Sequence, residues 1–361
     1  QKKYNLSLLM TKIAYVGMSS KLNAPGDRRR FSGYAKSRLI KIEKFNEKKK
    51  YDLIVLSQMA DLSFFLNYNK KNSKIIFDFV DAYLNEELSF KKIFRGIVKY
   101  LTFQNRFLYL NYSSLLKRVC SISDYVICTT NSQKREILKY SKNVEIILDA
   151  QDDDFIKDYK FEHTLGKKNK KLNILWEGQP GNINSLKAIS DLFKFYLNMN
   201  LINLHLLTDF KYNLLSGTNL KGNTKKLAYS ILGTKKNIYF HKWNKNNLNK
   251  MSKTCDIGIL PIVNFKKGIY ANKPANKIHL MWKLGLPVLS SPSAANKFSI
   301  LSSKINLICK NKYEWKNKID FFIKKKNENK ILIKKIGKKL RNYAFANYSN
   351  NIIFNKWDKV L

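Results

Sequence analysis

The sequence has few acidic residues: 26 Asp and Glu stand against 68 Lys and Arg, giving a formal net charge of +42. Such an excess attracts anionic partners, including phosphates and acidic lipid surfaces, and salt weakens the attraction. A solvated lysine-rich surface explains much of the charge equally well. The lysines are spread along the whole chain and no recognised nucleic-acid module is present, so no nucleic-acid partner is expected; a basic nucleic-acid-binding protein is kept as an alternative.

Cysteine and histidine are scarce, with four residues each, and they show no CxxC or Cys/His metal spacing. We therefore expect no metal site, and buried free thiols fit a reduced, cytoplasmic setting. No apolar run approaches the roughly 18 residues needed to span a bilayer, and no signal peptide is visible. The chain is long enough, and apolar enough at 44%, to form two globular domains.

Short strand-like apolar segments alternate with helical stretches, which is typical of an α/β protein with doubly wound parallel sheets. In the first half the strands are expected at residues 11–17, 39–42, 51–57, 74–80, 124–130 and 144–149. After a polar linker at 156–171 the pattern restarts at 171–176, 202–208, 237–243, 256–262, 286–290 and 305–309. This duplication predicts two Rossmann-like domains, 1–155 and 172–340, separated by a cleft.

Residues 264–293 combine a helix start, a helix stop and concentrated positive charge. Pro274 and Asn276 suit the beginning of a helix, and Gly285 ends it. No carboxylate occurs between Asp256 and Glu314. Because a helix N-terminus has free N–H groups, neighbouring lysines make it a suitable cradle for a diphosphate. The residues predicted to bind it are Lys267, Lys273, Asn276 and Lys277.

Asn276-Lys277 followed by Gly-Leu-Pro-Val at 285–288 resembles the donor-site segment of GT-B glycosyltransferases, which have two Rossmann-like domains and use nucleotide sugars. The resemblance implies metal-independent sugar transfer from a nucleotide sugar, the co-substrate, to a saccharide or lipid-linked acceptor in bacterial surface polysaccharide synthesis. It implies no other cofactor, and a C-terminal helix at 341–361 that returns to the first domain. In many retaining members a Glu on this helix holds the donor ribose. Leu280 stands at that position, so a catalytically inactive partner subunit stays open as an alternative.

The loop after the first strand, residues 18–31, contains three of the nine arginines of the chain in succession. The planar guanidinium suits bidentate binding of phosphate or carboxylate, and lysine does not replace it there. We expect this loop to bind an anionic acceptor or the donor through Gly17, Gly26, Arg28, Arg29 and Arg30. The alternative is a solvated helix start capped by an aspartate.

An inverting transferase needs a carboxylate that removes the acceptor hydroxyl proton. Asp27 precedes the three arginines, and Asp81 follows the expected fourth strand. We rank Asp27 first as the catalytic base and Asp81 second. Either residue can instead be a helix cap or an arginine partner.

Residues 176–185 follow the first strand of the second half and contain two glycines. Gly178 and Gly181 let the backbone approach a ligand, and Asn182 lies where a new helix can begin. The segment resembles the glycine loop that faces the donor phosphates in GT-B enzymes. Glu177 is the nearest carboxylate and is expected to hold a sugar or acceptor hydroxyl. The alternative is a plain turn between a strand and a helix.

Residues 89–103 interleave basic and large apolar side chains at helical spacing. Such a helix can lie on an anionic membrane surface, which would place the protein peripherally on the inner face of the cell membrane. The alternative, which we favour slightly on the sequence, is a helix that packs its apolar face on the core.

Overall fold

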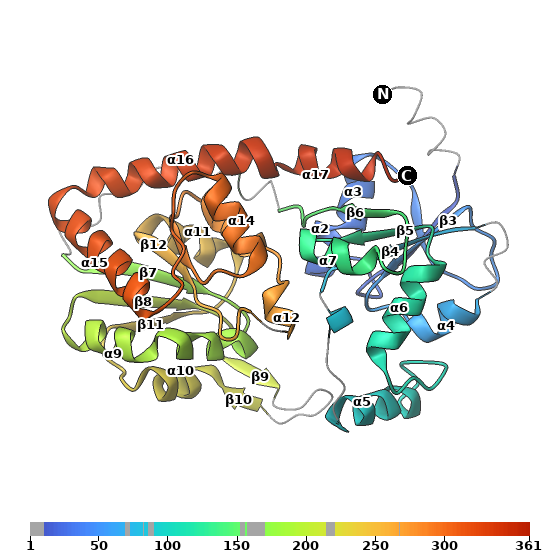
Figure 1. Cartoon of the computed structure of the whole chain (residues 1–361), viewed down its shortest axis with the longest axis horizontal. Coiled ribbons are helices and arrows are strands. Elements are labelled where there is room, and N and C mark those ends of the chain that lie inside the picture. Colours follow the sequence, from blue (N-terminus) through green and yellow to red (C-terminus); the bar gives the residue numbers. More distant parts are fainter. Residues whose placement is uncertain are drawn as a thin grey trace. The chain divides into compact units, whose positions relative to one another are not determined.

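The computed structural model describes residues 11–68, 73–81, 83–85, 90–151, 156, 170–213, 221–266 and 268–361 (Figure 1). Its contacts divide the chain into two compact units. The first unit comprises residues 1–152, 267–274 and 349–361, and the second comprises 153–266 and 275–348. The expected linker at 156–171 lies mostly outside the described residues.

The first unit is built on a six-stranded sheet in which all strand pairs are parallel. The strand order is β2-β1-β3-β4-β5-β6. The strands are β1 (Ile13–Val16), β2 (Ile42–Lys44), β3 (Leu53–Ser57), β4 (Lys74–Asp78), β5 (Tyr125–Cys128) and β6 (Val144–Ile146). The helical elements are α2 (Pro25–Arg29), α3 (Phe31–Ser37), α4 (Leu62–Asn67), η1 (Tyr83–Asn85), α5 (Phe90–Leu101), α6 (Tyr112–Ile122), α7 (Asn131–Ile137), α12 (Gly268–Ala271) and α17 (Asn350–Trp357).

Apolar cores cover both faces of this sheet, because alternate residues of a strand point to opposite sides. Ile54 and Leu56 of β3 pack with residues of α4, α6 and α7. Val55 of the same strand packs with α3 and with Trp357 of α17. Near-continuous apolar strands therefore follow from burial on both faces.

The second unit has a five-stranded parallel sheet in the order β11-β8-β7-β12-β13. Its strands are β7 (Leu172–Glu177), β8 (Ile202–Leu207), β11 (Ile238–His241), β12 (Ile257–Leu260) and β13 (Val288–Ser290), with a separate antiparallel pair of β9 (Lys211–Asn213) and β10 (Lys221–Asn223). Its helical elements are η2 (Pro180–Ile189), α9 (Ser190–Asn198), α10 (Thr224–Leu232), α11 (Lys245–Thr254), α13 (Asn276–Lys283), α14 (Ala294–Ser302), α15 (Lys312–Glu328) and α16 (Lys330–Tyr348).

Three expectations differ from these elements. The strand expected at 305–309 is reduced to a single bridge between Ser290 and Ile308. The strand expected at 39–42 begins later, because Leu39 adopts a left-handed conformation with φ of 58° after α3. The C-terminal segment of the first unit starts at 349 rather than 341, because α16 continues to Tyr348 within the second unit.

Each sheet has a point where successive strands are added in opposite directions. In the first unit it lies between β1 and β3, and in the second between β7 and β12. Doubly wound sheets bind ligands beside the carboxyl ends of the strands at this point. Ligands are therefore expected beside the loops after β1 and β7.

Candidate functional site

Three segments of the second unit meet at the carboxyl end of β7. The Lys277 Nζ donates to the backbone oxygen of Glu177 at 2.7 Å and lies 3.1 Å from Glu177 Oε2. The indole Nε1 of Trp243 donates to the other carboxylate oxygen, Oε1, at 2.9 Å. Lys277 belongs to the first turn of α13, Glu177 ends β7, and Trp243 follows β11. The fold thus places a cation, its counter-ion and an aromatic ring at the switch point of the sheet.

The close approach of these groups depends on Gly178. A Cβ atom at this position would lie 2.8 Å from the ring of Trp176 and 3.1 Å from Lys277 Nζ. The side chain of Lys277 remains 34% exposed, whereas that of Glu177 is only 11% exposed. The ammonium group can therefore meet an anionic ligand while its protein partner stays buried.

The other residues expected in this site do not contact Glu177 or Lys277 through any side-chain hydrogen bond seen in the described residues. The Asn276 side-chain oxygen is buried and has no hydrogen-bond partner within the described part of the chain. Lys273 belongs to the first unit, where its Nζ lies 5.1 Å from the centre of the Tyr270 ring. Gly181 faces open space, and the backbone N–H of Asn182 donates to Gln179 at the start of η2. Lys267 lies outside the described residues.

The loop after β1 is organised around Asp27, which is fully buried. One carboxylate oxygen accepts from Met18 N at 2.6 Å and from the Tyr15 hydroxyl at 3.0 Å. The other accepts from Ser19 N, Ser19 Oγ and Ala24 N. Burial, with Asp78 and Asp27 nearby, raises the pKa of Tyr15, so its phenol stays neutral.

These contacts correct the ranking of the two candidate bases. Asp27 holds the loop by accepting from protein donors at both oxygens, and it is closed to solvent. The glycines of the loop serve the same packing: a Cβ at Gly17 would lie 2.8 Å from Asp27 Oδ1, and one at Gly26 would lie 2.1 Å from the sulfur of Met18. Asp27, Gly17 and Gly26 therefore shape the loop.

The three arginines of the loop have different environments. Arg30 is buried, and its Nε donates to both oxygens of Asp78 at 2.9 and 2.8 Å. Its Nη1 donates to the Ile147 backbone oxygen at 2.8 Å and to Asp149 Oδ1 at 3.1 Å. Although burial alone would lower the pKa of Arg30, the charge of Asp78 raises it, so the guanidinium stays protonated. Arg30 ties the loop to β4 and the end of β6, and the expectation that it binds substrate is not supported.

Arg28 and Arg29 are more accessible than Arg30. Arg28 is exposed, and its Nη1 donates to the Asn23 backbone oxygen at 2.6 Å. Arg29 is half-buried, and its Nε has no hydrogen-bond partner in the described residues. Arg28 is consequently the arginine of this loop best placed to meet an anion.

Asp81 lies beyond the carboxyl end of β4 and is half-buried. Its Oδ2 accepts from Gln58 Nε2 at 2.9 Å, and its backbone N–H donates to Gln58 Oε1 at the same distance. Gln58 directly follows β3. This arrangement fixes the backbone around Asp81 and leaves its carboxylate with far fewer protein donors than Asp27 has.

Two histidines that look unrelated in the sequence are neighbours in the second unit. His205 Nδ1 and His241 Nε2 are 3.0 Å apart on the adjacent strands β8 and β11. Burial and the neighbouring His241 lower the pKa of His205 to about 4. Only the strand order brings them together, so no local signal could have found this pair. Within the described residues, no three His, Cys, Asp or Glu side chains form a group that could hold a metal ion.

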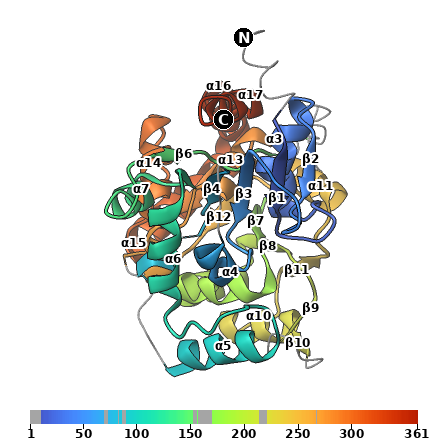
Figure 2. The same ribbon diagram turned by 90° about the vertical axis from the view of Figure 1, so that its right-hand side faces the viewer.

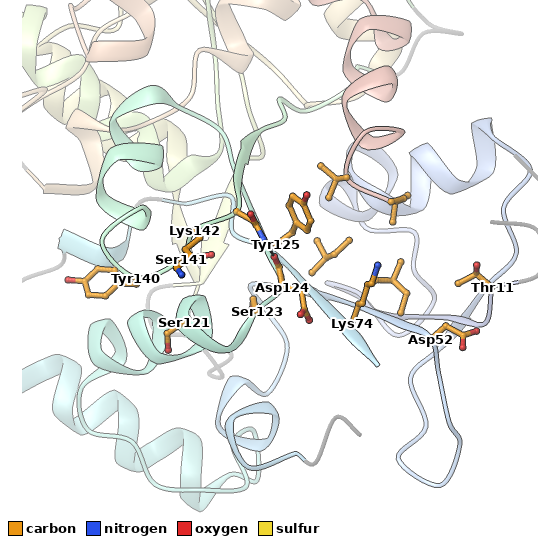
Figure 3. Close-up of a pocket in the computed structure, with 15 residues that line it drawn as sticks. Thr11, Asp52, Lys74, Ser121, Ser123, Asp124, Tyr125, Tyr140, Ser141 and Lys142 are labelled. Atoms are coloured by element: carbon orange, nitrogen blue, oxygen red, sulfur yellow. Dashed lines mark hydrogen bonds between the residues drawn. The ribbon is translucent and has the colours of Figure 1, made fainter. Parts of the chain in front are cut away.

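A cavity of about 730 Å³ lies in the first unit at the opposite edge of the sheet (Figure 3). Asp52 and Asp124 on its wall each accept from a backbone N–H at 2.7 Å, those of Lys12 and Ile75. These carboxylates close the amino ends of the strands. The cavity is therefore far from the loops where doubly wound sheets bind ligands.

The described part of the chain contains no helix with both the length and the apolar character needed to cross a membrane. All four cysteines are buried free thiols. Burial raises the pKa of Cys120 and Cys128 to about 12, so both thiols stay protonated and unreactive.

No family model matches the chain, and no curated protein matches it by sequence. Several solved structures share its fold. HepE from Anabaena, solved in complex with UDP, is 12% identical with a TM-score of 0.64, and the match covers 97% of this chain and 99% of HepE. A glycosyltransferase from Rickettsia africae is 14% identical with a TM-score of 0.59, covering 99% and 93%.

TarM is 13% identical with a TM-score of 0.58 over 85% of this chain, which spans only 54% of TarM. The agreement over nearly the whole length of two of these proteins, with the two parallel sheets described above, confirms the expected architecture: the chain has the GT-B fold, two Rossmann-like units of the kind found in nucleotide-sugar glycosyltransferases.

Proposed function

We propose that the protein is a glycosyltransferase that transfers a sugar from a nucleotide-sugar donor to a saccharide or lipid-linked acceptor in bacterial surface polysaccharide synthesis. One observation carries the proposal. Lys277, at the start of α13, has a side chain that is 34% exposed at the carboxyl end of β7 in a Rossmann-like unit. A cation beside a helix N-terminus at a switch point is suited to binding a diphosphate.

Lys277 and the N–H groups of the first turn of α13 neutralise the charge that develops on the leaving nucleoside diphosphate. This electrostatic role can replace a metal ion, so the proposal includes metal-independent transfer. The buried carboxylate of Glu177 holds Lys277 in place, and Trp243 holds that carboxylate. Glu177 is thus a positioning residue in this proposal, rather than the residue that binds a sugar hydroxyl.

For an inverting reaction we propose Asp81 as the base that accepts the proton of the acceptor hydroxyl. Its carboxylate is half-buried and bonded to Gln58, whereas both oxygens of Asp27 are occupied by protein donors. Replacing Asp81 by Asn should abolish turnover and leave the affinity for UDP unchanged. Normal turnover in this variant would remove Asp81 from the mechanism.

The protein is further proposed to be cytoplasmic and to act at the inner face of the cell membrane. The four buried free thiols support a reducing compartment.

A thermal-shift panel of nucleoside diphosphates, including UDP, and nucleotide sugars first identifies the best ligand. Isothermal titration calorimetry with that ligand then tests the proposed donor site. Lys277→Ala should weaken binding of that ligand at least tenfold, or about 1.4 kcal/mol. Lys226→Ala is the matched control, because Lys226 is an exposed lysine in the first turn of α10 in the same unit. It should bind as the wild type does.

Equal affinities of the Lys277→Ala variant and the wild type would overturn the assignment of the donor site. A wild-type protein that binds nucleotide sugars but neither hydrolyses nor transfers them would instead be the inactive partner subunit. A protein that binds no nucleotide from the panel would contradict the proposed function as a whole.

A further inference from the structure

Helix α5 and the segment after it expose an unusual run of apolar side chains. Nine large hydrophobic residues between Phe94 and Leu110 are exposed. Phe94 and Leu101 are 67% and 65% exposed, and Phe103 is 95% exposed. Single exposed apolar residues are common in folded proteins, but a cluster of this kind marks an interaction surface. We call Phe94, Ile97, Val98, Leu101 and Phe103 the α5 surface.

The α5 surface is a continuous stripe along the helix. Phe94, Ile97, Val98 and Leu101 follow the spacing i, i+3, i+4 and i+7, which places them on one face. The helix packs through another face: a Cβ at Gly96 would lie 2.4 Å from the Tyr109 backbone oxygen. The apolar stripe therefore points away from the packed side, so the interpretation in which it packs on the core is wrong.

The segment that carries this surface is fixed to the rest of the first unit. The backbone N–H of Arg106 donates to Asp61 Oδ2 at 2.8 Å, and that of Phe107 donates to Ser63 Oγ at 3.1 Å. The Arg106 guanidinium lies 4.4 Å from the centre of the Phe64 ring. Figures 1 and 2 both show α5 beyond the end of α6 that lies farther from the strands of its unit.

The backbone conformation of Phe103 is a second indication that the α5 surface binds a partner. Its φ of 55° places it in the left-handed region, where glycine or asparagine is the ordinary residue. A phenylalanine there strains the backbone, and because it is almost fully exposed, packing within the fold does not compensate for the strain. Phe103 therefore contributes little to the stability of the fold, and its exposed ring is available for contact with a partner.

The charge around the α5 surface indicates the chemistry of that partner. Residues 88–123 contain seven Lys and Arg and no acidic residue. A second copy of the chain would bring two such segments together, which like-charge repulsion disfavours. Apolar side chains among lysines and arginines match an anionic bilayer, whose headgroups attract the cations while its acyl region takes up the apolar groups.

We propose that the α5 surface docks the protein onto an anionic phospholipid bilayer, with Phe94, Leu101 and Phe103 entering the boundary between headgroups and acyl chains. This inference stands without the proposed transferase activity. Only its consequence, that the docked enzyme meets a lipid-linked acceptor at the membrane, rests on the proposed function.

The experiment is co-sedimentation of the full chain with vesicles of phosphatidylglycerol and phosphatidylcholine, compared with vesicles of phosphatidylcholine alone. Binding should require the anionic lipid and weaken as salt is added. Leu101→Ser and Phe103→Asn should each reduce binding about tenfold, because each removes one inserted apolar group. Phe103→Asn should melt at or above the wild-type temperature, because asparagine accepts the left-handed conformation.

Phe298→Ser is the matched control, because Phe298 is also highly exposed but lies on α14 of the second unit. It should bind vesicles as the wild type does. Wild-type binding by Leu101→Ser and Phe103→Asn, or no binding of the wild type to anionic vesicles, would overturn the proposal. So would light scattering that shows a dimer which Leu101→Ser dissociates. Calorimetry with UDP on the same variants keeps the two proposals separate, because Lys277 belongs to the other unit.

Discussion

Replacing Arg30 by lysine preserves the charge of the buried site but not its geometry. The guanidinium connects Asp78 at the end of β4 with Asp149 and the Ile147 backbone oxygen beyond β6. A lysine has a single ammonium group and cannot span both sides. We therefore expect Arg30→Lys to act on the stability of the first unit before it acts on any substrate.

The size of this effect follows from burial. Arg30 and Asp78 are 1% and 0% exposed, so a carboxylate that loses its partner keeps little access to water. Breaking a buried pair costs about 3–5 kcal/mol, and the lysine retains part of the interaction, so we expect about 3 kcal/mol. For a unit of this size, that lowers the melting temperature by about 6–12 °C.

Differential scanning calorimetry measures this loss, and Arg28→Lys is the matched control. Arg28 is exposed, so the conservative change should alter stability by no more than about 0.5 kcal/mol. If Arg28 binds an anionic acceptor, Arg28→Lys should instead raise the KM for that acceptor. An Arg30→Lys protein that melts with the wild type would refute the assignment of Arg30 as the connection between β4 and β6.

Two further predictions concern the second unit. Burial, and to a lesser extent the charge of Lys283, lowers the pKa of His279 to about 3. Between about pH 6.5 and pH 3 only the unfolded chain therefore takes up the proton. The free energy of unfolding should fall by about 1.4 kcal/mol for each unit that the pH drops in this range. Urea titrations at pH 7 and pH 5 measure this loss. The His279→Gln variant, whose side chain can keep the hydrogen bond to Ser299, should not show it. An equal pH dependence of stability in the variant and the wild type would contradict the reasoning. Gly337→Ala should destabilise the second unit by more than about 2 kcal/mol, because a Cβ at Gly337 of α16 would lie 2.1 Å from the backbone oxygen of Gly285, which follows α13. An unchanged urea midpoint would show that α16 does not approach the end of α13 so closely.

The sequence predicted the architecture well because the signal for it is local. Buried parallel strands need runs of apolar residues, and their alternation with helices repeats in both halves of the chain. The prediction of Lys277 as a donor-site residue also rests on a local signal, since a helix start and an acid-free lysine-rich segment are visible within a few residues, and it stays a prediction. Two boundaries differ from the prediction: the second strand begins only at Ile42, after Leu39, and the C-terminal segment of the first unit begins only after Tyr348.

The partners of the charged residues could not be predicted in this way. Arg30 meets Asp78, Glu177 meets Lys277, and His205 meets His241, and each of these pairs is far apart in the chain. Which side chains meet depends on the order of the strands and on the faces that the helices cover. Local patterns set the elements, whereas the paths of the connections set the neighbours.

The sequence by itself determined that this protein has two units with parallel sheets and a strongly cationic surface, because apolar periodicity and composition are properties of the chain alone. Only the tertiary structure decided that Asp27 and Arg30 are buried and hold the loop after β1 in place, that Lys277 stays partly exposed beside Glu177, and that the apolar face of α5 is exposed to solvent. The physical reason is burial: the same residue types support the fold where packing removes water, and remain available to a ligand or a membrane where it does not.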